Sequence, residues 1–186
     1  MITDGIVRRA DKLVDHYNDI ESTFSHIQRD IIIGGNWVRD YGGFDSYQVG
    51  LEISDDITAV TTGRMKPEEE QVMKHLPWML WKEWINTLSN FKYGIQLGTA
   101  AAGTFNLNCS FHGIPCIAYS NSNTQNILHP LTTVELGDMD KAKHIAKKLK
   151  NDKFYNLCSD TTLKRYESYY SESKFIENTQ RIFSTL

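Results

Sequence analysis

The stretch that decides the fold is YGIQLGTAAAGTFNLNCSFHGIPCIA, residues 93–118. Residues 93–97 predict a buried strand, and residues 98–103 form a loop that contains only glycine, threonine and alanine. A short helix is expected over residues 104–112, because Gly113 and Pro115 stand where helices end. A second strand over residues 115–119 then completes a strand–loop–helix–strand unit, which is typical of a parallel α/β sheet.

The loop at 98–103 is suited to an anionic ligand. Small residues leave the backbone open to close approach, and the start of a helix offers free N–H groups and a positive dipole end to a phosphate. We therefore expect a nucleoside diphosphate to place its phosphates at the backbone of Gly103, Thr104 and Phe105, and a valine at position 103 to block that site while leaving the fold largely intact. The alternative is that the alanines only pack the loop against its neighbours.

Further strands are predicted from residue 29 to the glycines at 34 and 35, over residues 57–62, and over residues 132–136. Helices are expected over residues 4–22, from Pro67 to a break at Pro77, from Asp138 onward, and over residues 160–184. A stripe after Pro77 is expected to face the core; it consists of Trp81, Trp84, Ile85 and Leu88. Residues 37–56 are either a long functional loop or a small excursion, and residues 120–131 are expected to be a polar loop.

This alternation predicts one Rossmann-like α/β domain over residues 1–186, with a parallel sheet and helices on both faces. In such sheets ligands bind beyond the carboxyl ends of the strands. The segments expected at that edge are residues 34–36, 63–66 and 98–106.

The order of these segments resembles the C-terminal, nucleotide-sugar-binding domain of GT-B-fold glycosyltransferases. The sequence GIPCIA at 113–118 is similar to the family's Gly-x-Pro-Val-Ile-Ala segment, DIIIGG at 30–35 to its second strand, and TAVTTGRM at 58–65 to its third strand and the following turn. TVELGD at 133–138 and the helix after it are similar to the family's last strand and helix. The resemblance covers roughly residues 30–155 and implies that a nucleoside-diphosphate sugar is the donor substrate.

The sequence also departs from the family's pattern. Large retaining families carry two glutamates eight positions apart in this loop and helix, and the matching positions here hold Ala100 and Asn108. The family's first strand has no visible counterpart before residue 29, and neither does its N-terminal acceptor-binding domain. The chain is therefore expected to be a half-enzyme, a fragment, or a domain that binds without catalysing.

The resemblance implies a set of binding residues. Those expected at the nucleotide or its phosphates are Arg64, Met65, Lys66, Gly98, Thr99, Gly103, Thr104, Phe105 and Asn108, with Asn108 at the ribose. Gln125 and His129 are expected to contact the sugar, although His129 could instead close its loop by hydrogen bonds. Arg64 and Lys66 could neutralise a diphosphate leaving group or simply be solvated charges before a helix. No catalytic residue is identified.

Composition limits the partners. The formal net charge of −3 provides no field for nucleic acid or an anionic membrane surface, and no apolar run is long enough to span a bilayer. Cys109, Cys116 and Cys158 lack zinc spacing and are interpreted as reduced core residues, so a cytoplasmic location is expected, with no metal and no cofactor. The expected partners are a nucleotide sugar and a second copy or partner chain that supplies an acceptor domain.

Three functions follow from these observations. The first is a glycosyltransferase or its donor-binding half, which uses a nucleoside-diphosphate sugar. The second is a nucleotide-sugar epimerase of the same fold, although no catalytic carboxylates are well placed for it. The third is a non-catalytic binding or interaction subunit, which the replaced glutamates and the missing half favour.

Overall fold

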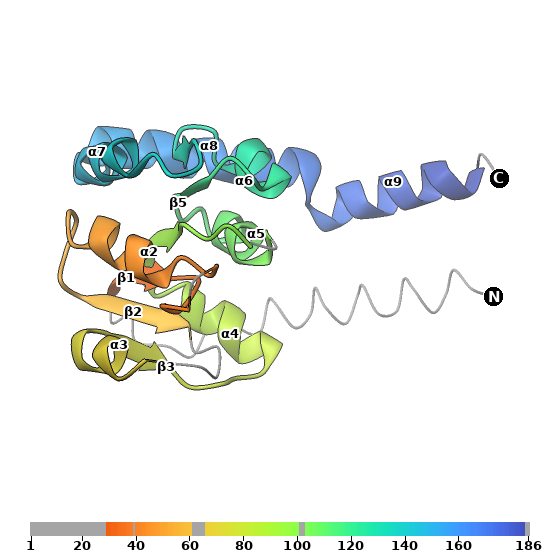
Figure 1. Ribbon diagram of the computed structural model, residues 1–186. Coiled ribbons are helices and arrows are strands. Elements are labelled where there is room, and N and C mark those ends of the chain that lie inside the picture. The colour runs from red at the N-terminus through yellow and green to blue at the C-terminus, as the bar shows by residue number, and fades with distance from the viewer. Residues whose placement is uncertain (1–28, 39, 61–65, 101–102, 185–186) are drawn as a thin grey trace.

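The computed structural model describes residues 29–38, 40–60, 66–100 and 103–184. A six-stranded parallel sheet runs through the molecule in the order β3-β2-β1-β4-β5-β6 (Figure 1). The strands are β1 (Arg29–Ile33), β2 (Ile57–Val60), β3 (Lys74–Leu76), β4 (Phe91–Gln96), β5 (Cys116–Tyr119) and β6 (Thr133–Val134). The α/β fold with a Rossmann-like parallel sheet is therefore confirmed.

Helices connect these strands and extend beyond them. They are α2 (Gly43–Gly50), α3 (Pro67–Val72), α4 (Trp81–Leu88), α5 (Thr104–Phe111), α6 (Asn123–Leu128), α7 (Met139–Leu149), α8 (Asp152–Tyr169) and α9 (Glu172–Ser184). The helix expected over residues 4–22 lies outside the described residues. Figure 1 shows α9 projecting away from the body of the domain, and no side chain of this helix is buried. No helix among the described residues has the length and apolarity needed to cross a membrane.

The central strand β1 faces core on both sides. Ile31 and Ile33 join a cluster that includes Val49 of α2 and the apolar side of α7, whereas Ile32 joins a second cluster with Leu88 of α4 and Phe105 of α5. Successive strand residues point to opposite faces, so the three isoleucines pack against the helices on both sides of the sheet.

Strand β3 corrects the expected assignment of the strands. We predicted a helix from Pro67 to Pro77, but α3 ends at Val72 and Met73 is extended, with φ −133° and ψ 152°. With β3 counted, β1 lies between β2 and β4 and occupies the place of the first strand in a doubly wound sheet of order 3-2-1-4-5-6. Residues 30–35, which we likened to the family's second strand, therefore occupy the place of the first strand in the sheet.

Other segments also differ from expectation. Residues 43–50 form α2, and residues 123–128 form α6 within the expected polar loop. The tryptophan stripe is only partly in the core: Ile85 and Leu88 are buried, but Trp81, the first residue of the helix, is 52% exposed. The three cysteines are buried and unpaired, as expected.

His129 connects three elements in the interior. Its Nε2 lies 2.9 Å from the carbonyl oxygen of Asn106 in α5, and its Nδ1 lies 3.3 Å from the backbone nitrogen of Cys116 and 3.1 Å from Thr162 Oγ1 in α8. A backbone N–H can only donate, so Nδ1 is the acceptor and Nε2 carries the proton. Burial lowers the pKa of His129 to about 4, because the charged imidazolium would lose its hydration.

We expect this histidine to make stability depend on pH. The unfolded imidazole takes up a proton near pH 6.5, whereas the folded one does so near pH 4. The free energy of unfolding should therefore fall as the pH drops from 6.5 to 4, by an amount on the order of 3 kcal/mol, since a tenfold difference in proton affinity corresponds to about 1.4 kcal/mol. Urea unfolding across this pH range measures the slope.

The variant His129→Gln should be less stable than the parent at pH 7, because it leaves buried partners unpaired. It should also lose most of the slope between pH 6.5 and 4. Replacement of the exposed His144 by glutamine is the matched control and should leave the slope unchanged. Equal slopes in His129→Gln and the parent would contradict this interpretation.

Candidate functional site

The loops that follow β1 and β4 meet at one edge of the sheet. Both strands are parallel neighbours, and the chain order reverses direction between them, which marks the place where doubly wound sheets bind ligands. Residues 34–36 and 98–100 lie at this carboxyl edge, as predicted. Of the third predicted segment, Lys66 is described and exposed, whereas Arg64 and Met65 lie outside the described residues.

The two loops touch through their backbones. Gly42 adopts φ 68°, and a β-carbon there would collide with the carbonyl group of Leu97. The backbone nitrogen of Ala100 donates to the carbonyl oxygen of Asp40 at 3.1 Å, and Ser46 Oγ accepts from the backbone nitrogen of Leu97 at 2.9 Å. The loop before α2, which we had not assigned, therefore forms one wall of the site.

A third loop, after β5, completes the edge. Asn121 Nδ2 donates to the carbonyl oxygen of Thr99 at 2.9 Å and reaches that of Gly98 at 3.4 Å. Sequence reasoning missed Asn121, although its position directly after a predicted strand is the signal that points to the same edge. These contacts leave the side chain of Thr99 exposed while they fix the course of its backbone.

The first turn of α5 presents Thr104 to solvent, whereas Phe105 is buried against Gly34. Gly103, the residue before the helix, has φ 78°, and a β-carbon there would lie 2.6 Å from Thr124 Oγ1 and 3.0 Å from Ser122 Oγ. We had expected a valine at position 103 to leave the fold largely intact. The left-handed backbone and the tight contact show that such a change also strains the loop itself.

Three of the predicted side chains are engaged within the protein. Asn108 is 5% exposed, and the amide orientation that satisfies both of its neighbours accepts from Trp84 Nε1 at 2.8 Å and donates to the carbonyl oxygen of Thr104 at 3.2 Å. Gln125 is fully buried, where its amide accepts from Asn106 Nδ2 at 2.7 Å and donates to the carbonyl oxygen of Cys116 at 2.9 Å. The contacts of His129 described above correspond to loop closure, the second of its two expected roles.

Glu69 holds the loops after β1 and β2 together. This carboxylate is fully buried, and its Oε2 accepts from the backbone nitrogens of Trp37 at 3.1 Å and Lys66 at 3.4 Å. Its Oε1 lies 3.1 Å from His75 Nε2 on β3. One side chain thereby fixes Lys66 relative to the central strand.

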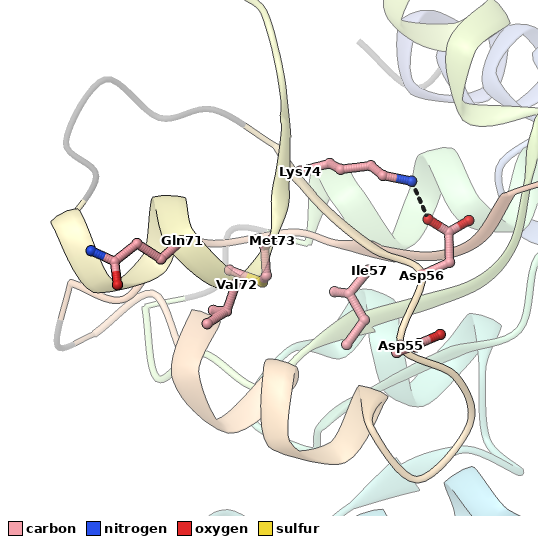
Figure 2. Close-up of a pocket in the computed structure, with 7 residues that line it drawn as sticks. All are labelled: Asp55, Asp56, Ile57, Gln71, Val72, Met73 and Lys74. Carbon is pink, nitrogen blue, oxygen red and sulfur yellow. Dashed lines mark hydrogen bonds and ion pairs between the residues drawn. The ribbon is translucent and has the colours of Figure 1, made fainter.

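A separate cavity of about 510 Å³ opens at the opposite, amino edge of the sheet (Figure 2). Asp55 and Asp56 come just before β2, and Lys74 begins β3. Figure 2 shows the ion pair between Lys74 Nζ and Asp56 Oδ1, which is 2.7 Å long, on the wall of this cavity. Its position at the amino ends of the strands separates it from the ligand-binding edge. Among the described residues, no three or more acidic, histidine or cysteine side chains gather as a metal site.

Comparison with known proteins gives a match at the level of the fold. No family model matches the chain, and no curated protein matches it. Solved structures do: TarM has a TM-score of 0.62 at 13% identity over 88% of this chain and 37% of TarM. HepE of Anabaena, in complex with UDP-glucose, has a TM-score of 0.63 at 10% identity over 86% of this chain and 50% of HepE.

A third structure, AviGT4, a glycosyltransferase involved in avilamycin A biosynthesis, has a TM-score of 0.59 at 11% identity over 86% of this chain and 52% of AviGT4. The chain thus spans about half the length, or less, of the structures that it matches. Its six-stranded sheet and helices have the fold of one half of a GT-B glycosyltransferase.

Proposed function

We propose that this chain is the donor-binding half of a glycosyltransferase and binds a nucleoside-diphosphate sugar. The observation that carries the proposal is the position of residues 98–100, after β4, and of Gly103 at the start of α5, at the point where the sheet reverses its chain order. The structure of HepE, which shares the fold, was solved with UDP-glucose bound.

In this proposal the diphosphate lies at the N-terminus of α5. The first N–H groups of a helix have no intrahelical partner and its dipole is positive at this end, so the backbone of Gly103, Thr104 and Phe105 favours an anion. The exposed hydroxyl of Thr104 adds a donor, whereas that of Thr99 already donates to Asp40 Oδ1 at 3.5 Å and would have to leave this carboxylate to reach a phosphate. The ammonium group of Lys66 adds positive charge at the same edge of the sheet.

The remaining residues of the expected set contribute to the proposal to different extents. Gly98 contributes only backbone, and Arg64 and Met65 stay in the proposal as the residues that flank the base or phosphates. The side chains of Asn108, Gln125 and His129 are already bonded inside the protein, so the proposal does not depend on them.

A second candidate is a subunit that binds the nucleotide sugar without transferring it. Ala100 stands where the family has a glutamate that contacts the donor sugar, and its methyl group is exposed at the edge without any charge. Binding of the diphosphate requires donors and positive charge, both of which are present, whereas transfer requires an acceptor site as well. Turnover of UDP-glucose by the purified chain alone, at ordinary enzyme rates of about 1 per second or faster, would exclude this second candidate.

Calorimetry with UDP and GDP tests the proposed site. We expect one of the two to bind, and Thr104→Ala to weaken it by about 1 kcal/mol, the typical worth of one hydrogen bond, which is about a fivefold rise in Kd. The control Thr179→Ala removes a threonine hydroxyl from α9, outside the proposed site, and should leave Kd unchanged. If neither nucleotide binds, or both variants match the parent, the diphosphate site is not at α5.

Substitution of Asn108 tests whether this residue has a structural role or binds the ribose. We expect Asn108→Ala to lower the free energy of unfolding by about 1–3 kcal/mol, because it leaves the indole N–H of Trp84 unpaired, and to leave the Kd for UDP unchanged. Trp84→Phe in the Asn108→Ala background should cost less than in the parent, since the hydrogen bond is already lost. A selective loss of UDP affinity without loss of stability would instead assign Asn108 to the ribose.

Exposed apolar side chains favour association with a second chain or domain. Trp78 is 79% exposed, Leu80 61%, and Phe183 68%. Because apolar surface of this kind is normally covered, we expect light scattering to show self-association of the purified chain. Replacement of Phe183 and Ile182 on α9 by serine should reduce the apparent mass, whereas serine at the exposed Gln180 should not. A monomer at all concentrations would contradict this expectation.

A further inference from the structure

A second, smaller pocket lies at the ligand-binding edge of the sheet. Trp37, Phe44, Lys66 and Glu68 line a cavity of about 260 Å³. Trp37 belongs to the loop after β1, Phe44 to the first turn of α2, and Lys66 and Glu68 to the start of α3. Pockets for drug-sized ligands measure about 300–1,000 Å³, so this volume suits a ligand of one ring.

The two sides of this pocket are held in fixed positions by one buried group. Glu69 Oε2 accepts from the backbone nitrogens of both Trp37 and Lys66, at 3.1 Å and 3.4 Å. The Glu69 side chain is fully buried and is itself held by His75. A pocket whose walls share a buried carboxylate is preformed, which is the property that a binding site needs.

The aromatic side of the pocket is a packed cluster with an open ring. Trp37 and Phe44 meet edge to face, with centroids 5.0 Å apart, and Tyr47 lies behind Trp37 at 5.5 Å. Phe44 is nevertheless 46% exposed, so part of its ring faces solvent. Trp37 Nε1 is buried and has no hydrogen-bond partner among the described residues.

The opposite side of the pocket has one charged hydrogen-bond donor and one charged hydrogen-bond acceptor. The ammonium group of Lys66 donates and the carboxylate of Glu68 accepts, and both side chains are exposed. Together they carry no net charge, so the pocket does not favour a phosphate. Vicinal hydroxyls of a sugar, each of which both donates and accepts, match this pair of groups.

We propose that this pocket binds the pyranose ring of a saccharide, stacked on the half-exposed ring of Phe44 beside Trp37, with its hydroxyls toward Lys66 and Glu68. The C–H groups on one face of a pyranose are weakly positive and complement the negative face of an aromatic ring. A nucleobase would instead require a flat slot with edge-on hydrogen-bond partners. The inference deepens the proposed function and rests on it, because it assigns a sugar-binding subsite to the same edge of the sheet.

The pocket is coupled to the proposed phosphate site by backbone contacts. The loop that carries Trp37 continues to Asp40, whose carbonyl oxygen accepts from the backbone nitrogen of Ala100 at 3.1 Å. Gly42, directly before α2, packs on Leu97 at the end of β4. A saccharide beside Phe44 therefore lies on the same rigid pair of loops as a diphosphate at α5.

The test is an NMR titration of the whole chain with methyl β-D-glucopyranoside, methyl α-D-mannopyranoside and cellobiose. The chain has four tryptophans, so its indole N–H signals are few, and Trp37→Phe identifies the signal of Trp37. We expect at least one sugar to shift this signal with a Kd on the order of 1 mM, the affinity expected for a single ring.

Single substitutions test whether the sugar binds in this pocket. Phe44→Ala removes a half-exposed ring and should weaken the sugar about fivefold or more, and Lys66→Met should weaken it as well. Phe175→Ala on α9 removes an exposed phenylalanine elsewhere and is the matched control, expected to leave the Kd unchanged. Uridine, titrated in parallel, tests the nucleobase as the occupant.

The inference is overturned if no sugar shifts the Trp37 signal at concentrations of about 100 mM, well above the expected Kd. It is equally overturned if Phe44→Ala binds as the parent does, or if uridine shifts the signal and the sugars do not. Calorimetry with UDP keeps the two proposals apart. UDP binding without a sugar shift rejects the saccharide subsite alone, whereas a sugar shift without UDP or GDP binding supports the subsite and rejects the diphosphate site.

Discussion

The close backbone contact between the loops after β1 and β4 is the constraint on which the site depends. Gly42 lies against the carbonyl group of Leu97, where no side chain fits, and its φ of 68° turns the chain into α2 at that point. Ser46, one turn into α2, then bonds to the backbone of Leu97. These contacts hold together the ends of the two central strands where the chain order reverses, and the described residues hold this edge in place with no disulfide and no cluster of metal-ligating side chains.

A consequence is that polar side chains near this edge are used to hold the fold together. Asn106 and Gln125 bond to each other, His129 joins α5 to β5 and α8, and Asn108 pairs with Trp84. Each would cost about 1–3 kcal/mol if left unpaired in the interior, so none is free to leave its partner for a ligand. On the proposed function, recognition then falls to backbone N–H groups and to exposed side chains such as Thr104 and Lys66.

This division explains how far the sequence was informative. The isoleucine run of β1, the glycine-flanked helix α5 and the amphipathic α7 have strong patterns, and each was predicted close to its observed bounds. Strand β3 was missed because it has three residues, two of them polar, before a proline. Helix α2 was missed because glycines flank it and its apolar periodicity is weak.

The candidate site was predictable in place but less so in detail. Small residues after β4 and a helix start after them locate the loop, because both are local properties of the sequence. The partners of Asn108, Gln125 and His129 are not local: Trp84 lies 24 positions before Asn108, and Thr162 lies 33 positions after His129. Sequence alone therefore could not separate buried amides and imidazoles from ligand contacts. The role of Glu69, which joins Trp37 to Lys66 and His75, is hidden for the same reason.

The exposed position of Ala100 bears on whether this edge can do chemistry. On the proposed function, a diphosphate leaving group needs N–H donors and positive potential, and the start of α5 offers both without a carboxylate at position 100. The sugar would then be held by other groups, and Lys66 and Glu68 are a charged donor and acceptor that share a pocket with aromatic rings at this edge. On the proposed function, the exposed Trp78 and Leu80 after β3 are the surface that a second, acceptor-carrying domain would cover. Contact with a second domain at that side would cover apolar surface and bring an acceptor to the sugar in one step, which is why binding by this chain and transfer by an assembly are compatible properties of the same edge.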